Sequence, residues 1–264
     1  MLDRLGVSFH WKRFPFVLAG VWAVMLVPST RAALVNWDVL TWTPGTLSNS
    51  YDVDPSNAGT DVTFNIAGSV GRFRNDRQTN IPTPAITMSL TGGLSPVEQS
   101  LQWAADMQTS SRMTFTVNFS PQYLSGVTDV SFSIFDIDLD TNKDKITNIY
   151  GIALDGTHIA ATITLGSAIN RNGNGLNQVL VGVQTVPDSG PGAAAGTATI
   201  SFGSTPITGF AFTWSNSQGS EHYQEIAIGD IFYNVVVPEI NPAALVALIC
   251  ILAGSIASRE DSKS

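Results

Sequence analysis

The stretch Met113-Thr-Phe-Thr-Val-Asn-Phe119 decides the fold class, because apolar and polar side chains alternate along it without a break. Successive side chains of an extended strand point to opposite faces, so this pattern predicts a strand with one buried face. The same period returns in the segments 130–134, 159–165, 210–214, 226–228 and 231–235, with turn-forming residues at 44–45, 92–93, 172–175 and 187–192. The sequence therefore predicts an all-β fold, an antiparallel β-sandwich of jelly-roll type.

One segment has two interpretations. Residues 95–98, Ser-Pro-Val-Glu, have the order of a helix start, with an N-cap, a proline and a glutamate three positions on. The residues that follow alternate instead, with Leu101, Trp103, Ala105 and Met107 set between smaller or polar neighbours. We expect a strand from about Gln99 rather than a helix.

Composition excludes several classes of protein. The chain has 264 residues, a net charge of −8 and only 13% charged residues, which argues against a coiled coil and against a charged disordered chain. The acidic balance argues against nucleic acid as a partner. The single cysteine, Cys250, allows neither an internal disulfide nor a multi-cysteine metal site.

The N-terminal segment 1–32 has the organisation of a secretory signal peptide. Arg4, Lys12 and Arg13 precede an apolar run over 14–27, which is shorter than the about 20 residues of a membrane-spanning helix. Small residues then stand at the −3 and −1 positions of a cleavage site between Ala32 and Ala33. We expect a signal helix that is removed there; the alternative is a retained N-terminal anchor.

The C-terminal segment 238–264 begins with Pro238-Glu239-Ile-Asn-Pro and continues with a charge-free run over 243–257, followed by Arg259. This order resembles the PEP-CTERM sorting signal of Gram-negative bacteria, although isoleucine stands where that family usually has its second proline. The resemblance implies export across the inner membrane and transient anchoring there by a short hydrophobic helix. It also implies processing by an exosortase, then delivery to the cell surface or an extracellular polysaccharide matrix. The alternative is a simple membrane anchor.

Between the two ends lies a body of residues 33–237, long enough for one core. It carries 17 acidic and 7 basic residues and no cysteine. Its segments 127–138 and 224–231 are similar to strands of many secreted sorting-signal proteins, which implies a β-sandwich ectodomain and assigns no activity.

A run of carboxylates follows one predicted strand. Asp136, Asp138 and Asp140 are two residues apart, so an extended strand would place all three on one face. Calcium would neutralise them, with Asn142 and Asp144 as further ligands. The run lacks the glycine and the distal glutamate of an EF-hand loop. The two interpretations are a calcium site, with Asp230 as a second possible location for the ion, and a solvated strand end balanced by lysines.

Enzyme motifs are absent from the body: it has no His-Glu-x-x-His pair, no Gly-x-Ser-x-Gly elbow and no phosphate-binding glycine loop. Glu221-His222 is interpreted as a solvated loop. Four tryptophans could either pack in the core or form a sugar-stacking face: Trp37, Trp42, Trp103 and Trp214. Three tyrosines lie in polar sequence contexts and could contact a ligand: Tyr51, Tyr123 and Tyr223.

We expect a structural or adhesive protein and not an enzyme. The alternatives are a carbohydrate-binding module, which an exposed row of aromatics would favour, and a glycan-active enzyme, which two carboxylates about 5 to 9 Å apart in a cleft would favour.

Overall fold

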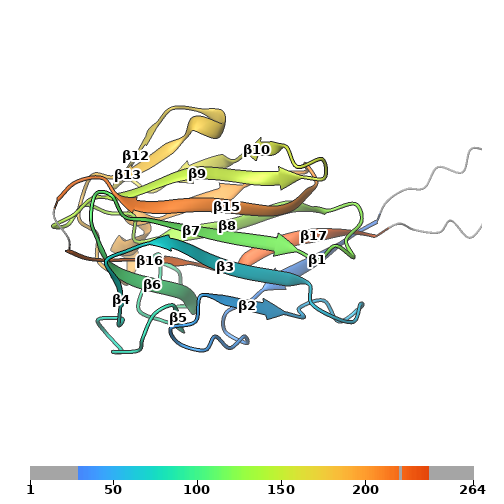
Figure 1. Ribbon diagram of the computed structural model, residues 1–264, viewed down its shortest axis with the longest axis horizontal. Helices are drawn as coiled ribbons and strands as arrows, with labels where there is room; N and C mark the ends of the chain where they lie inside the picture. Colours follow the sequence, from blue (N-terminus) through green and yellow to red (C-terminus); the bar gives the residue numbers. More distant parts are fainter. Residues whose placement is uncertain (1–28, 220–221, 238–264) are drawn as a thin grey trace, which may run out of the picture. The chain divides into compact units, whose positions relative to one another are not determined.

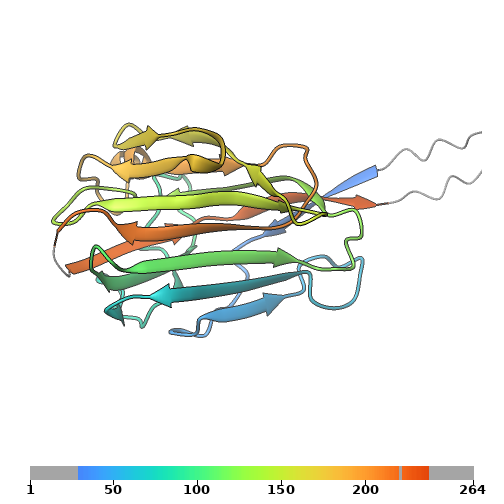
Figure 2. The ribbon, with the colours of Figure 1, turned by 45° about the horizontal axis from the view of Figure 1, so that its top comes forward.

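Antiparallel strands form two layers in the part of the chain that the computed structural model describes, residues 29–219 and 222–237 (Figures 1 and 2). The β8 layer contains β1 (Ser29–Val35), β4 (Arg72–Arg74), β5 (Ala85–Thr87), β6 (Ser100–Met107), β8 (Val127–Phe135), β11 (Thr162–Leu165), β14 (Ala198–Ser201), β16 (His222–Ile228) and β17 (Ile231–Val237). The β15 layer contains β2 (Ser48–Tyr51), β3 (Val62–Ser69), β7 (Arg112–Phe119), β9 (Asp144–Ala153), β10 (His158–Ala160), β12 (Ile169–Asn172), β13 (Val179–Gly182) and β15 (Ile207–Asn216). Two short 3₁₀ helices, η1 (Gly175–Asn177) and η2 (Pro191–Gly196), complete the elements of the described residues.

The pairing of the strands defines the sandwich. In the β8 layer, β16 and β17 run one after the other along one side of β8, with β6 and β1 beyond them, and β14 then β11 lie on the other side. In the β15 layer the order is β2–β3–β7–β15–β9, extended by β10, β13 and β12. Long strands from β6 to β9 alternate between the layers, as strands of a jelly roll do. The predicted fold is confirmed, and so is a strand rather than a helix at 100–107.

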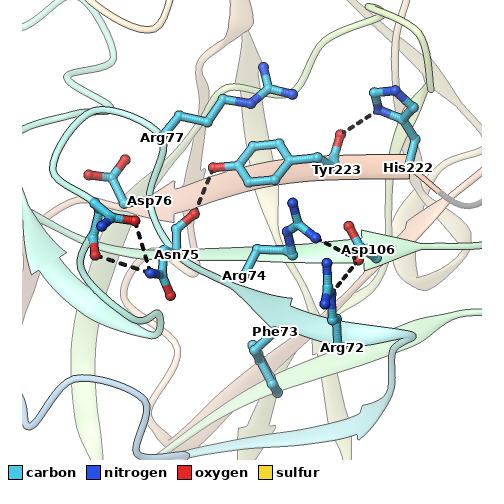
Figure 3. A pocket seen from close by; sticks show the side chains of 10 residues that line it. Arg72, Phe73, Arg74, Asn75, Asp76, Arg77, Asp106, His222 and Tyr223 are labelled. Carbon is cyan, nitrogen blue, oxygen red and sulfur yellow. Dashed lines mark hydrogen bonds and ion pairs between the residues drawn. The ribbon is translucent and has the colours of Figure 1, made fainter.

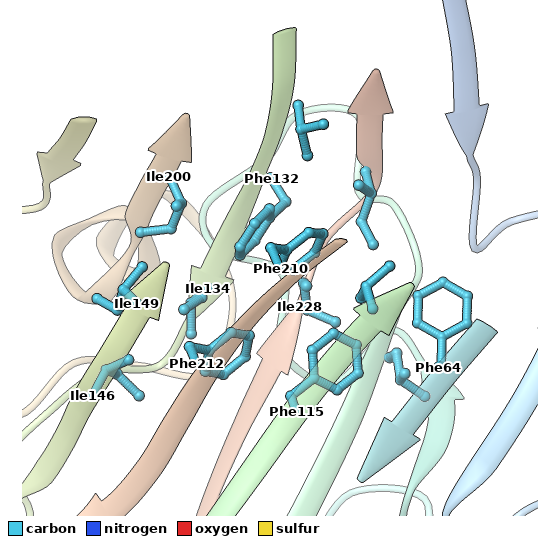
Figure 4. Packing of buried hydrophobic residues seen from close by; sticks show 14 of the residues in the cluster. Phe64, Phe115, Phe132, Ile134, Ile146, Ile149, Ile200, Phe210, Phe212 and Ile228 are labelled. Atoms are coloured by element: carbon cyan, nitrogen blue, oxygen red, sulfur yellow. The ribbon is translucent and has the colours of Figure 1, made fainter. Parts of the chain in front are cut away.

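The core lies between the layers. Alternate residues of β7 are buried, so the polar threonines between them face the other way. Aromatic rings pack both between and within the layers (Figure 4). The ring centroids of Phe132 on β8 and Phe210 on β15 are 4.4 Å apart, a contact between the layers. Those of Phe115 and Phe212, both in the β15 layer, are 5.4 Å apart. The core interpretation of the four tryptophans is confirmed, because Trp37, Trp42, Trp103 and Trp214 are all buried.

Both faces of β6 are buried, as are both faces of β15. One face of β6 packs in the core, and the segment 75–99 covers the other. Ser100 donates a hydrogen bond to the carbonyl oxygen of Leu90 (2.9 Å), and Gln102 donates one to Asp76 (3.1 Å). This cover brings a polar loop against the outer face of β6 and β16, where the candidate site lies.

The two ends of the sandwich meet in one strand pair. β1 pairs antiparallel with β17, with Ser29 opposite Val237 and Val35 opposite Ile231. The predicted cleavage site between Ala32 and Ala33 therefore falls inside β1, and cleavage there would leave Ala33–Val35 as the N-terminal part of that strand; the site stays a prediction. The signal helix before residue 29 and the C-terminal helix lie outside the described residues, among which no helix is long and apolar enough to cross a membrane.

Candidate functional site

The carboxylate run does not lie on one strand face, so that prediction is wrong. β8 ends at Phe135, and Asp136 has a positive φ of 66°, which turns the chain out of the sheet. A bend of this kind is uncommon for residues other than glycine, asparagine and aspartate. The segment after β8 becomes a connection that crosses to β9 in the other layer, with Asp138 half-buried and Asp140 exposed.

Hydrogen bonds fix this connection at both of its ends. The buried Asp144 at the start of β9 accepts hydrogen bonds from the indole of Trp214 (2.7 Å) and the amide of Gln224 (2.9 Å). Asp138 accepts one from the backbone N–H of Val186 (3.2 Å). Gly182 is required beside it, because a Cβ there would overlap the carbonyl oxygen of Asp138. The loop after β13 is therefore held against the connection.

The connection, that loop and β16 enclose what we call the acidic pocket, a cavity of about 200 Å³. Six carboxylates line it: Asp136, Asp138, Asp140, Asp144, Asp188 and Glu225. All five residues of the sequence-predicted metal site reach this pocket, since Asn142 lines it as well. Sequence reasoning missed Asp188 and Glu225. One carboxylate oxygen each of Asp136, Asp188 and Glu225 lies within 4.8 Å of the others.

Burial and mutual repulsion raise the pKa values of these carboxyl groups. Burial is the main cause for Asp136 and for Asp144, whose pKa values lie well above the usual range, and neighbouring carboxylates raise both further. Burial also raises the pKa of Asp138 to about 6, although the hydrogen bond from the backbone N–H of Val186 lowers it in part. The pKa of Glu225 is raised by burial too, although the hydroxyl of Tyr223 opposes the shift. Without a cation, these carboxyl groups therefore keep their protons to a higher pH than free carboxyl groups do.

An open groove lies beside the acidic pocket, and we call it the arginine groove (Figure 3). Its volume is about 920 Å³, and its charged and aromatic lining includes Arg72, Arg74, Arg77, Asp106, His222 and Tyr223. Arg72 and Arg74 both donate to the same oxygen of Asp106, at 2.9 and 3.4 Å. Each guanidinium has five N–H groups, so most of their donors remain for a ligand. Three of the seven basic residues of the body gather here.

Tyr223 and Arg77 line both cavities. The guanidinium carbon of Arg77 lies 4.0 Å from the centroid of the Tyr223 ring, a cation–π contact. The hydroxyl of Tyr223 donates to Glu225 (2.5 Å), and Gln102 donates to the same oxygen of Glu225 (2.7 Å). The wall between the two cavities is therefore held by hydrogen bonds that reach back to β6.

The remaining sequence-predicted residues are scattered. Of the three tyrosines, Tyr223 reaches the groove, whereas Tyr123 is buried and donates to Asp61 (2.7 Å), and Tyr51 donates to the carbonyl of Thr41 (2.7 Å). His222 is exposed at the start of β16, and Glu221 lies outside the described residues. Asp230 directly precedes β17. The sorting residues Pro238, Glu239 and Arg259 lie outside the described part.

No aromatic platform is exposed on the described residues. Phe232 is the one phenylalanine, tyrosine or tryptophan among them with a largely exposed side chain, at 53%.

No protein-family model matches the sequence, and no curated protein matches it. Among solved structures, the chain is similar to a carbohydrate-binding module studied for specific mannan recognition, with 10% identity over 78% of this chain and 98% of that chain and a TM-score of 0.37. It is also similar to the enzymatically active domain of tailspike protein 4 of bacteriophage CBA120, with 13% identity over 66% of this chain and 19% of that chain and a TM-score of 0.27. Both scores are low, and neither likeness assigns a ligand to this chain.

Proposed function

We propose that the chain is an exported, surface-sorted adhesive protein whose sandwich holds an acidic polysaccharide of the cell envelope or extracellular matrix. The signal-peptide pattern of 1–32 and the PEP-CTERM-like tail of 238–264 support export and sorting by an exosortase. Neither segment supports a role inside the cell.

The observation that carries the proposal is the arginine groove. Its volume of about 920 Å³ falls within the roughly 300–1,000 Å³ of pockets that bind organic ligands. Guanidinium groups bind carboxylates in pairs of parallel hydrogen bonds. Three arginines outnumber the two aspartates, Asp76 and Asp106, that line this groove, and in a body with 17 acidic residues this favours an anionic ligand such as a uronic-acid polymer.

The test compares polysaccharides of different charge. The exported protein, purified as the producing cell makes it, is run in gels that contain either a polyuronate or neutral mannan. We expect retardation by the polyuronate that weakens with added salt. Arg72→Gln removes a charge-assisted hydrogen bond, worth about 1.5–3 kcal/mol, so polyuronate affinity should fall about tenfold or more.

Arg171→Gln is the matched control, because it removes the same charge from an exposed strand, β12, outside the groove. Retardation by mannan alone, or equal losses for Arg72→Gln and Arg171→Gln, would contradict the proposal.

A glycan-active enzyme is less well supported. The carboxylates of the acidic pocket come close enough for acid–base work, but the pocket holds only about 200 Å³, below the range of pockets for organic ligands.

A further inference from the structure

The acidic pocket has the dimensions of an ion site. Calcium binds oxygen ligands at about 2.3–2.6 Å, so two ligands on opposite sides of one ion lie up to about 5 Å apart. The oxygens of Asp136, Asp188 and Glu225 that face one another lie within 4.8 Å, which lets a single calcium ion contact all three. They come from three separate segments: the connection after β8, the loop after β13, and β16.

The carboxylates of the acidic pocket form no ion pair among the described residues. The ion pairs of the described residues join Arg31 to Asp54 and join Arg72 and Arg74 to Asp106, so none of them involves the six lining carboxylates. Arg77 is the one basic residue among the residues that line the pocket, and it is exposed and stacked on Tyr223. Buried carboxylates without a cation partner are costly.

Two buried amides supply an observation independent of charge. Asn142 is only 3% exposed and lines the pocket, yet neither its Oδ1 nor its Nδ2 has a hydrogen-bond partner among the described residues. Its Oδ1 packs against Gly219, so the amide would have to turn over to present its oxygen to an ion in the pocket. Gln224 donates through Nε2 to Asp144, but its Oε1, also buried, has no described partner. Buried polar atoms are almost always paired, with protein, water or an ion, and amide oxygens are calcium ligands.

The hydrogen bonds that do exist leave ligand atoms available. Both donors to Glu225, Gln102 and Tyr223, bond to Oε2, so Oε1 keeps its lone pairs. Gln78 bonds to Oδ2 of Asp188 (3.1 Å), which leaves Oδ1. These bonds orient the two side chains without using up their oxygens, as partners of metal ligands do.

We infer that the acidic pocket is a calcium site, in which Asp136, Asp188 and Glu225 supply carboxylate oxygens and Asn142 supplies an amide oxygen. Asp144 and Asp138 orient the surrounding backbone rather than serve as the main ligands, because their bonds to Trp214, Gln224 and Val186 hold them in the fold. The ion would fasten the connection after β8 to β16 and to the loop after β13.

The experiment measures calcium binding and thermal unfolding of the full exported protein after chelator treatment. We expect one calcium ion per chain with a dissociation constant of about 10⁻⁴–10⁻³ M. At ten times that constant, calcium should raise the Tm by about 3 to 6 °C. Magnesium at the same concentration should give a smaller rise, because it keeps its water and demands near-octahedral ligands.

Variants separate binding from folding. Asp188→Asn lies in a loop, and it should keep or raise the Tm in chelator because it removes repulsion, while it abolishes most of the calcium-dependent rise. Asn142→Ala changes no charge and should weaken calcium binding at least fivefold. Asp52→Asn, the control, removes an exposed charge outside the pocket and should leave the calcium response intact.

The inference is overturned if calcium gives the wild-type protein no rise in Tm, or if the rise survives in Asp188→Asn. An equal rise with magnesium, or unchanged calcium affinity in Asn142→Ala, would also contradict it. None of these readouts involves a glycan, so failure of the calcium site and failure of glycan binding are distinguishable.

Discussion

Asp230 is a half-buried carboxylate in the two-residue interruption between β16 and β17, and it lines neither cavity. Its Oδ1 accepts a hydrogen bond from the backbone N–H of Trp37 (2.9 Å). Burial is the main cause that raises its pKa to about 6; the Trp37 bond opposes the shift, and Glu98 and Asp38 add to it. The folded protein therefore binds this proton more tightly than the unfolded chain does.

The sign of the pH dependence follows. Above about pH 6 the ionised Asp230 destabilises the fold, and this penalty disappears as the pH falls from about 6 to about 4. Asp230→Asn keeps the acceptor for Trp37 and removes the charge. We expect it to raise the Tm by about 1–3 °C at pH 7.5, after discounting for partial exposure, and to leave it unchanged at pH 4.

Calorimetry across pH 4–8 checks this expectation, with Asp52→Asn as an exposed control. A Tm difference that is constant over the whole range would show that the charge of Asp230 is not the cause.

Residue by residue, the sequence identified two of the four ligands that we infer for calcium in the acidic pocket. Asp136 and Asn142 could be predicted, because they share one short run with a spacing that oxygen ligands favour. Asp188 belongs to a Pro-Asp-Ser-Gly segment that predicts only a turn, and Glu225 belongs to an alternating segment that predicts only a strand. Both reach the pocket through long-range packing, and no local spacing carries that information.

At the scale of elements, β7 offers a direct test of the alternation. Phe115 is fully buried between Phe64, Trp103 and Phe212, whereas Thr116 faces the other side of the sheet and is half-buried. Phe115→Ala should lower the free energy of unfolding by about 3–5 kcal/mol, because it leaves a large cavity in the core. Thr116→Ala, the neighbouring control, should cost far less. Denaturant unfolding measures both, and similar losses would mean that the two faces are not distinguished as described.

Strand positions could be predicted wherever period two reflects one buried face, as in β7 and β8. The same pattern failed at Asp136-Ile-Asp-Leu-Asp140, where alternation continues but the sheet does not. There a backbone turn with positive φ and close packing against Gly182 override the local preference. β6 is a strand although the residues before it, 95–98, resemble a helix start, and both of its faces are buried in the fold.

For the whole molecule, the described sandwich is complete at Val237, since β17 already pairs with β1 and β8. Deleting residues 238–264 should therefore leave the Tm of the exported protein unchanged. If the tail is the sorting signal that its sequence resembles, the deletion should move the protein from the membrane and surface fractions to the medium. Calorimetry and fractionation measure the two effects. A deletion variant that unfolds would make the tail part of the fold.

The arrangement of β16 and β17 as one continuous line has a mechanical consequence. The line starts at His222, which borders the arginine groove, and ends at Val237. Figure 1 shows β16 and β17 toward opposite ends of the sandwich. A polysaccharide pulling at the groove against an anchor beyond Val237 would load the line along its own axis. Antiparallel hydrogen bonds run perpendicular to their strands, so the bonds to β6, β8 and β1 would share such a load in shear. A tether attached at a loop would instead break these hydrogen bonds one after another.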